Sequence, residues 1–157
     1  MLTVNRILPP DGAAPVVATL SLTASDRAKS RHRFTADDGT AIYLNLPRGT
    51  VLRGGDLLGW EEETVIRVVA KPEPVVVVKA QSSFDLMRAA YHLGNRHVSL
   101  ELAPDHLKLE PDPVIETLLH QLGGLELTTV TLPFEPEAGA YRSTTHNHSP
   151  SHGHDHN

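Results

Sequence analysis

The order of hydrophobic periodicities between residues 75 and 132 most strongly limits how this chain can fold. Residues 75–78 are four consecutive valines, which is typical of a strand buried in the middle of a sheet. The segments that follow alternate between helical and strand periodicity and cover residues 83–93, 98–102, 106–110, 113–122 and 125–132. Their order is β-α-β-β-α-β, which predicts a ferredoxin-like domain.

Both predicted helices carry capping signals. Ser82 or Ser83 can cap the first helix, and Asp112 can cap the second. The apolar side chains that share one face of the first helix are Phe84, Met87, Ala90 and Tyr91. We expect this face to lie in the core, which would bury Met87 and Tyr91.

Short strands separated by glycine and proline turns dominate the first part of the chain. Alternating or β-branched segments occur at residues 2–4, 16–22, 31–35, 41–46 and 63–70. The step Asp38-Gly39 is a strong hairpin signal, because both residues tolerate positive φ. These features predict a small all-β domain.

The segment Lys71-Pro72-Glu73-Pro74 marks the boundary between the two parts. Its prolines remove backbone donors and stiffen the chain. We therefore predict an α+β fold class with a β-rich domain at residues 1–72 and a ferredoxin-like domain at residues 75–142. A disordered, histidine-rich tail is expected at residues 143–157.

The composition excludes several classes of function. The net charge of -5, with neutral histidines, argues against nucleic acid as the main partner. Without cysteine the chain can form neither disulfides nor a thiolate metal site. It also has no run of roughly twenty apolar residues, so we expect a soluble, cytoplasmic protein with no membrane partner.

Four basic residues alternate with other residues in and just before the predicted strand at residues 31–35. They are Arg27, Lys29, Arg31 and Arg33. On an extended backbone they would share one face, which is either a solvated face or a docking surface for an acidic protein. His32 lies between two of them on the opposite face, and we interpret it as structural.

In residues 89–98 a predicted helix ends and a histidine follows directly after it. Gly94 and Asn95 most readily take the left-handed conformation that ends a helix, so we expect His97 beyond a tight reversal at the start of a strand. On its own, such a histidine is usually interpreted as neutralising a helix C-terminus or filling a core edge. The far end of the chain favours a metal ligand instead.

The tail combines histidines with residues that cannot build a core. Its histidines are His146, His148, His152, His154 and His156. Ligands two residues apart lie on the same side of an extended backbone, so each His-x-His pair can chelate one divalent ion such as Ni, Cu, Zn or Co. An added purification tag would normally be an uninterrupted histidine run, and this tail is interrupted.

A tight site at His97 needs further ligands, because one imidazole leaves most coordination positions to water. A homodimer with its two-fold axis near His97 would bring two copies together, and both tails could reach the shared ion. Binding should weaken as pH falls through the ordinary titration range of imidazole, near about 6.5, because protons compete for the nitrogens. Such an exchangeable site suits a carrier.

We interpret His92 as a surface residue and assign neither His106 nor His120 to metal.

Several motifs in collinear order resemble the UreE family of urease accessory proteins. In the first part they are Lys29-Ser30-Arg31, Asp37-Asp38-Gly39, Leu46-Pro47-Arg48-Gly49-Thr50 and Gly55-Asp56. In the second part they are Tyr91-His92-Leu93-Gly94-Asn95-Arg96-His97-Val98, Leu107-Lys108-Leu109-Glu110-Pro111-Asp112 and Pro133-Phe134-Glu135-Pro136-Glu137-Ala138-Gly139-Ala140-Tyr141. The resemblance covers nearly the whole chain.

The resemblance implies a homodimeric nickel metallochaperone that delivers Ni(II) for urease active-site assembly, with Zn(II) or Cu(II) as alternative ions in vitro. The implied partners are a UreG-type GTPase and the urease apoprotein complex. It also implies a first domain similar to the peptide-binding unit of a heat-shock co-chaperone. By position, His97 matches the family's bridging nickel ligand, and the tail matches its variable extension. Some members have a further His-x-His where this chain has Pro111 and Pro113, so those secondary sites should be absent here.

Three other interpretations compete with this one. A metal-dependent hydrolase lacks support, since the sequence has no His-Glu-x-x-His motif, no Gly-x-Ser-x-Gly elbow and no cysteine nucleophile. An RNA-binding ferredoxin-like sheet would need exposed aromatics on residues 98–102 and 106–110, which have none. A general storage or buffering protein for Ni, Cu or Zn fits the tail as well as delivery does. We therefore expect no enzyme and leave storage as the alternative.

Overall fold

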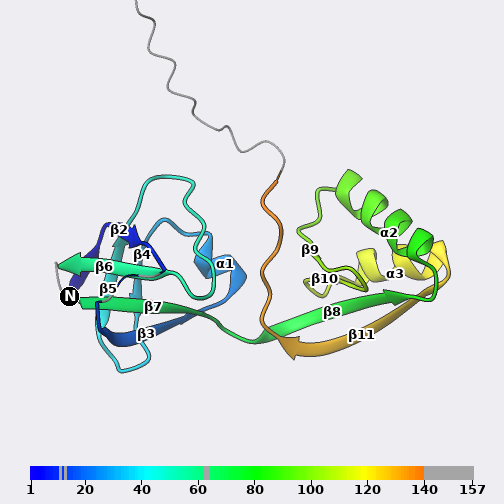
Figure 1. Cartoon of the computed structure of the whole chain (residues 1–157). Coiled ribbons are helices and arrows are strands. Elements are labelled where there is room, and N and C mark those ends of the chain that lie inside the picture. Colours follow the sequence, from blue (N-terminus) through cyan, green and yellow to red (C-terminus); the bar gives the residue numbers. More distant parts are fainter. Residues whose placement is uncertain (11, 13, 62–63, 140–157) are drawn as a thin grey trace, which may run out of the picture.

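The computed structural model describes residues 1–10, 12, 14–61 and 64–139. Two units lie side by side and are joined by a short connection between β7 and β8 (Figure 1). The N-terminal unit contains β1 (Leu2–Val4), β2 (Arg6–Leu8), β3 (Val16–Leu22), α1 (Ala24–Arg27), β4 (Arg31–Thr35), β5 (Ala41–Asn45), β6 (Leu57–Glu61) and β7 (Thr64–Ala70). The C-terminal unit contains β8 (Glu73–Ala80), α2 (Ser83–Asn95), β9 (Glu101–Leu102), β10 (Leu107–Leu109), α3 (Pro113–Leu122) and β11 (Leu125–Leu132).

Two sheets enclose the core of the N-terminal unit. Their strand orders are β1-β5-β4 and β2-β6-β7-β3. Strands β4 and β5 form the predicted antiparallel hairpin, in which Arg33 lies opposite Tyr43. Leu20, Leu44 and Ile66 are fully buried and come from different strands of the two sheets. The prediction of a β-rich unit is confirmed.

Three elements of this unit escaped the sequence analysis. Strands β2 and β6 pair with each other, and neither shows clear alternation because one is very short and the other contains Gly59. Helix α1 is a single turn capped by Thr23, whose hydroxyl accepts a hydrogen bond from the Asp26 N–H. A helix this short has no apolar periodicity to detect.

The C-terminal unit has the predicted ferredoxin-like β-α-β-β-α-β order. Its sheet runs β11-β8-β10-β9, so the valine-rich β8 lies between two other strands, as its composition indicates. Both helices cover the same face of this sheet (Figure 1). Val76 and Val78 are fully buried against that helical layer. The α+β fold class is confirmed.

The predicted helix ends in this unit are largely as expected. The Ser82 hydroxyl caps α2 by accepting from the Asp85 N–H. Asp112 caps α3, with Pro113 at the first helical position, and Gly123 ends that helix at φ 75°. The predicted strand over residues 98–102 is shorter, because β9 begins only at Glu101.

The face of α2 that we expected in the core is the wrong one. Met87 and Tyr91 are 66% and 65% exposed. The helix instead buries Ala89 and Leu93, with Leu86 half-buried beside them. The inner face of α2 thus combines a small alanine with two leucines, while Phe84, Met87 and Tyr91 remain outside.

After β11, residues 133–139 form an extended segment, called the strap below, that runs between the two units and is orange in Figure 1. No helix or strand is predicted at residues 133–141, and the described part of this range has none. Phe134 of the strap is nevertheless buried with Ala24 and Val75, which come from different units. None of the described helices is long and apolar enough to cross a membrane.

Candidate metal centre

His97 follows directly on helix α2 at the point where the chain reverses. The Val98 N–H donates to the Leu93 carbonyl at 3.1 Å, and the His97 N–H donates to the Gly94 carbonyl at 3.0 Å. These bonds form a Schellman motif in which His97 is the left-handed residue, at φ 56°. Its side chain is exposed.

The expectation that Gly94 or Asn95 would be the left-handed residue is wrong. Both residues are helical, and α2 extends to Asn95. Leu93 is fully buried, and Val98 packs against the same core cluster. This apolar contact across the helix end places the reversal at His97 rather than earlier in the chain.

A left-handed histidine is an unfavourable choice for ending a helix. Among the described residues, His97 is the only one other than glycine with a positive φ. An L-residue with a Cβ atom costs roughly 1–2 kcal/mol in this conformation, and glycine or asparagine usually fills the position. Strain of this kind clusters at functional sites, so the imidazole itself is the feature to explain.

The described part of one chain does not complete a metal site around His97. No three histidine, aspartate or glutamate side chains within it lie close enough to hold an ion together. The predicted tail ligands lie outside the described residues, namely His146, His148, His152, His154 and His156. His97 therefore presents one imidazole on the surface of each chain.

The other histidines of the C-terminal unit have local partners or stand apart. His106 Nδ1 lies 2.7 Å from Asp105 Oδ1, and this hydrogen bond lowers the pKa of the Asp105 carboxyl. The ring of His92 meets Tyr91 edge-on, with 5.3 Å between centroids. His120 is exposed in the last turn of α3.

Both units of the chain match models of one protein family. The family model for the N-terminal domain of the UreE urease accessory protein matches residues 4–71, and the model for its C-terminal domain matches residues 73–157. The chain belongs to the UreE family. Urease accessory protein UreE from Nostoc sp. is 51% identical over 144 residues, which cover 90% of this chain and 96% of that protein.

Two other relatives support the same membership. Urease accessory protein UreE from Verminephrobacter eiseniae is 51% identical over 150 residues, covering 90% of this chain and 89% of the relative. The protein of the same name from Ralstonia nicotianae is 48% identical over 160 residues, covering 99% and 73%. UreE is a family of accessory proteins for urease maturation and not of enzymes, so the prediction that this chain is not an enzyme is confirmed.

An apolar stripe lies on the outer face of α2 in this UreE-family chain. Phe84, Met87 and Tyr91 are spaced three and four residues apart, and each is 64–66% exposed. Val114, at the start of α3, is 76% exposed. A shallow hollow near the end of α2 is lined by Arg96, Pro113, Val114, Thr117, Leu118 and Gln121.

The predicted four-residue basic face does not exist as such. Arg27 belongs to α1 and is only 1% exposed, and Lys29 forms an ion pair with Asp26 at 2.7 Å. Of the four basic residues, Arg31 and Arg33 lie on β4, where both are exposed. The sequence pattern failed because a helical turn interrupts the extended backbone that alternation requires. His32 lies exposed between Arg31 and Arg33 with its ring edge-on to Phe34, at 4.7 Å between centroids, and its structural role stays a prediction.

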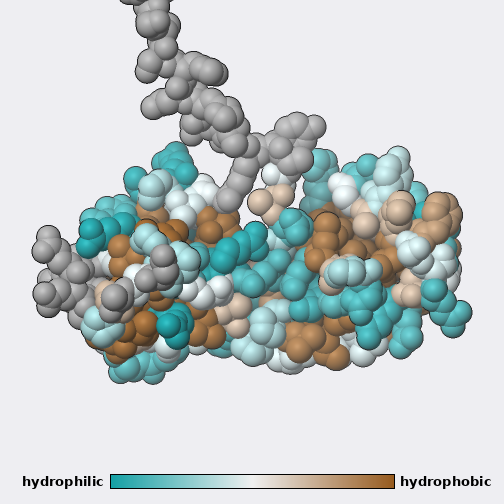
Figure 2. Space-filling view, in the orientation of Figure 1, coloured by the Kyte–Doolittle hydropathy of each residue, from teal (hydrophilic) through white to brown (hydrophobic). Residues whose placement is uncertain are grey.

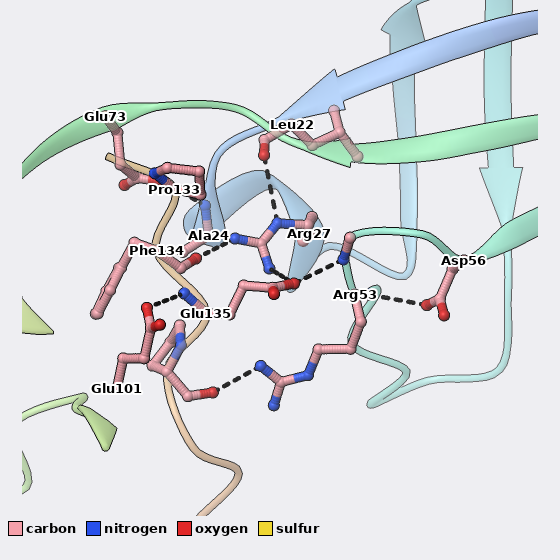
Figure 3. Close-up of polar contacts among 12 residues, drawn as sticks. Leu22, Ala24, Arg27, Arg53, Asp56, Glu73, Glu101, Pro133, Phe134 and Glu135 are labelled. Atoms are coloured by element: carbon pink, nitrogen blue, oxygen red, sulfur yellow. Dashed lines mark hydrogen bonds and ion pairs between the residues drawn. The ribbon is translucent and has the colours of Figure 1, made fainter. Parts of the chain in front are cut away.

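Sequence reasoning also missed the polar contacts around Arg27 and the strap (Figure 3). The available signal was Phe134, a large aromatic between two prolines in an otherwise polar segment. Polar residues dominate the surface visible between the two units (Figure 2). Hydropathy alone therefore gave no indication that the strap passes between them.

Proposed function

We propose that this chain is a homodimeric nickel metallochaperone that delivers Ni(II) for urease active-site assembly in the cytoplasm. Nickel is its cargo and binds between two copies of His97, with further imidazoles from the tail. The proposed tail ligands are His146, His148, His152, His154 and His156. The proposal includes the division of the chain at residues 1–72, 75–142 and 143–157.

The observation that carries this proposal is the left-handed backbone of His97. Gly94 and Asn95 lie just before it, so residues suited to a simple helix end are close at hand. The position keeps a histidine in spite of the conformational cost and exposes its side chain. A neutral imidazole is a favoured ligand of Ni, Cu and Zn, which gives a reason for the choice.

The exposed stripe on α2 supports the dimeric part of the proposal. Large apolar side chains gathered on a surface are typical of protein interfaces. Tyr91 lies four residues before Asn95, the last residue of α2, which is about 6 Å along the helix at 1.5 Å per residue, and His97 follows two residues later. An isologous dimer that pairs this stripe with itself, with its axis near the end of α2, would bring both His97 side chains to one ion.

Replacing Met87 by glutamate is expected to shift the dimer towards monomer without unfolding the chain. A carboxylate buried in an apolar interface loses its hydration, which costs several kcal/mol. Light scattering at micromolar concentration should show a mass near one chain, while circular dichroism stays unchanged. Val17→Glu, at an exposed apolar position of β3, is the matched control and should remain dimeric. A dimeric Met87→Glu variant would remove α2 from the proposed interface.

Delivery and storage make different demands on the bound nickel. A delivery protein associates with the urease assembly machinery and gives up its ion there, whereas a store only sequesters it. The nickel-loaded chain should bind a UreG-type GTPase and activate urease apoprotein in the presence of a chelator that captures free nickel. Activation no greater than that by free nickel under the same conditions would favour the storage alternative.

A further inference from the structure

The two units are connected at two places. The first is the chain segment between β7 and β8, which consists of Lys71 and Pro72, and the fixed φ of the proline restricts it. The second is the strap, which follows β11 and runs between the units (Figure 1). One connection alone would act as a hinge, whereas two connections restrict the rotation of one unit against the other.

Direct contacts between the units are few among the described residues. The Ala24 N–H of the N-terminal unit donates to Glu73 Oε2 of β8 at 2.8 Å. Ala24 also belongs to a small buried cluster with Val75 and Phe134. Among the described residues of this cluster Ala24 alone comes from the N-terminal unit, and the others come from the C-terminal unit and the strap. The apolar contact between the units therefore depends on Phe134.

Arg27 of the N-terminal unit is a buried cation whose partners lie mostly on the strap. It is 1% exposed. Its Nη2 donates to the Phe134 carbonyl, and its Nη1 donates to Glu135 Oε1 at 3.3 Å (Figure 3). Its Nε donates to the Leu22 carbonyl of its own unit at 3.3 Å. The guanidinium thus joins β3 of the N-terminal unit to the strap.

The N-terminal unit holds the strap at two further points. The Gly54 N–H donates to Glu135 Oε1 at 2.6 Å, so this carboxylate oxygen is shared with Arg27. Arg53 Nη1 donates to the Pro136 carbonyl at 2.8 Å. We call Arg27 and Arg53 together the arginine clamp. Both guanidiniums bond to strap carbonyls, so the clamp holds the backbone of the strap itself.

The strap is also bonded to the C-terminal unit. The Glu135 N–H donates to Glu101 Oε2 at 2.9 Å, and the Glu137 N–H donates to the Leu100 carbonyl at 2.7 Å. Along residues 134–137 the bonds therefore go in turn to one unit and to the other. The strap cannot keep all of them if the two units rotate against each other.

The strap can leave its place while both units stay folded. Neither the core cluster of the N-terminal unit nor that of the C-terminal unit contains a strap residue. Closing the strap also has a cost, because it removes the Arg27 guanidinium from water. Burial lowers the pKa of Arg27, and the Glu135 carboxylate opposes this change. The closed state therefore gains less than the three bonds of Arg27 alone suggest.

We propose that the strap is a latch that fixes the angle between the two units. The arginine clamp holds the latch closed, and residues 71–72 are the hinge on which the units turn when it opens. None of these residues is a proposed nickel ligand, so the inference stands apart from the proposed function. The open state exposes Arg27 and Phe134, so a partner that binds either of them shifts the population towards the open state.

The angle between the units can be followed with one spin label on each unit of the full-length chain. The chain has no cysteine of its own, so labels attach only at introduced cysteines. Thr35→Cys on β4 and Glu126→Cys on β11 are exposed positions outside the strap contacts. Labelled chains are diluted with an excess of unlabelled chain, so that double electron–electron resonance measures the distance within one chain.

The test compares Arg27→Met and Arg53→Met with Arg31→Met, which removes an exposed arginine of β4 and leaves the strap contacts intact. Arg53 is less buried than Arg27, so Arg53→Met keeps the test valid if Arg27→Met folds poorly. Hydrogen exchange at the amides of Glu135 and Glu137 reports whether the strap is released. Circular dichroism reports whether both units stay folded.

We expect exchange at both amides to be about tenfold faster or more in the clamp variants, because each variant removes hydrogen bonds from a charged donor. The distance distribution between the labels should broaden in these variants and stay unchanged in Arg31→Met. Circular dichroism should stay unchanged in all three. Faster exchange with an unchanged distance distribution would overturn the latch, because the direct contacts would then hold the angle. Unchanged exchange in both clamp variants would overturn the role of the clamp.

Discussion

Replacing His97 by glycine is expected to weaken the tightest nickel-binding event by more than about 100-fold, because even residues behind a ligand contribute 10–100-fold to metal affinity. The stability of the fold should not decrease. Glycine removes the left-handed penalty of roughly 1–2 kcal/mol and offsets part of that gain by its own entropy loss of roughly 0.5–1 kcal/mol. The free energy of unfolding in the absence of metal should stay constant or rise by up to about 1 kcal/mol. Calorimetry with nickel and denaturant unfolding measure the two effects separately.

Two companion variants make this result specific. His97→Ala should lose the same binding event but gain no stability, since alanine keeps the Cβ atom that the left-handed conformation disfavours. Deleting everything after Arg142 should lower the number of ions bound and weaken the site at His97 without abolishing it, while the thermal transition is unchanged. If His97→Gly binds nickel as tightly as the original chain, the histidine serves the helix end alone and the tail holds all the metal.

Replacing Phe134 by alanine is expected to destabilise the protein by about 3–5 kcal/mol, the usual cost of removing a fully buried phenylalanine side chain. Phe134 is 1% exposed and packs with Ala24 of the N-terminal unit and Val75 of the C-terminal unit. Its loss opens a cavity at the junction of the two units. For a chain of this length the midpoint of thermal unfolding should fall by roughly 6–20 °C.

The matched control is Leu132→Ala, close to Phe134 in the sequence but 38% exposed. A partly exposed leucine leaves a smaller cavity, so this variant should lose clearly less stability than Phe134→Ala. Calorimetric unfolding of the metal-free proteins gives both values. Equal, small effects of the two substitutions would mean that Phe134 does not pack between the units in solution.

Much of the fold could be predicted from local patterns. The four valines of β8 indicated a central strand, and the caps at Ser82 and Asp112 marked both helix starts. These signals are local, since each depends on a few neighbouring residues and on one backbone conformation. The β-α-β-β-α-β order then followed from the order of the predicted helices and strands along the chain.

The wrong predictions share a physical cause, which is long-range packing. The residues near α2 in the sequence do not indicate that this helix buries the small Ala89 and leaves Met87 exposed. Which face is buried depends on how the helix packs on its sheet. The left-handed residue is likewise decided by the contact of Val98 with the core beyond the helix end. Arg27 was predicted to share a charged face with Lys29, Arg31 and Arg33, whereas its buried site depends on Phe134, which lies 107 positions away in the sequence.

The candidate site could be predicted residue by residue but not as an arrangement. The sequence indicated His97 and the tail histidines through their residue type and spacing. It could not show that His97 holds the strained position itself, or that the strap is bonded to Leu100 close to it. Both features arise from tertiary structure, and the second places the strap, which precedes the tail, close to His97 in the sequence.

The most direct measurement counts nickel ions and chains in the same particle. Native mass spectrometry of the full-length protein, given one nickel ion for every two chains, reports both numbers at once. The expected species contains two chains and one ion, and it should be lost in His97→Gly. A first ion bound to a single chain, or a two-chain species that persists unchanged in His97→Gly, would contradict a site shared between two copies of His97.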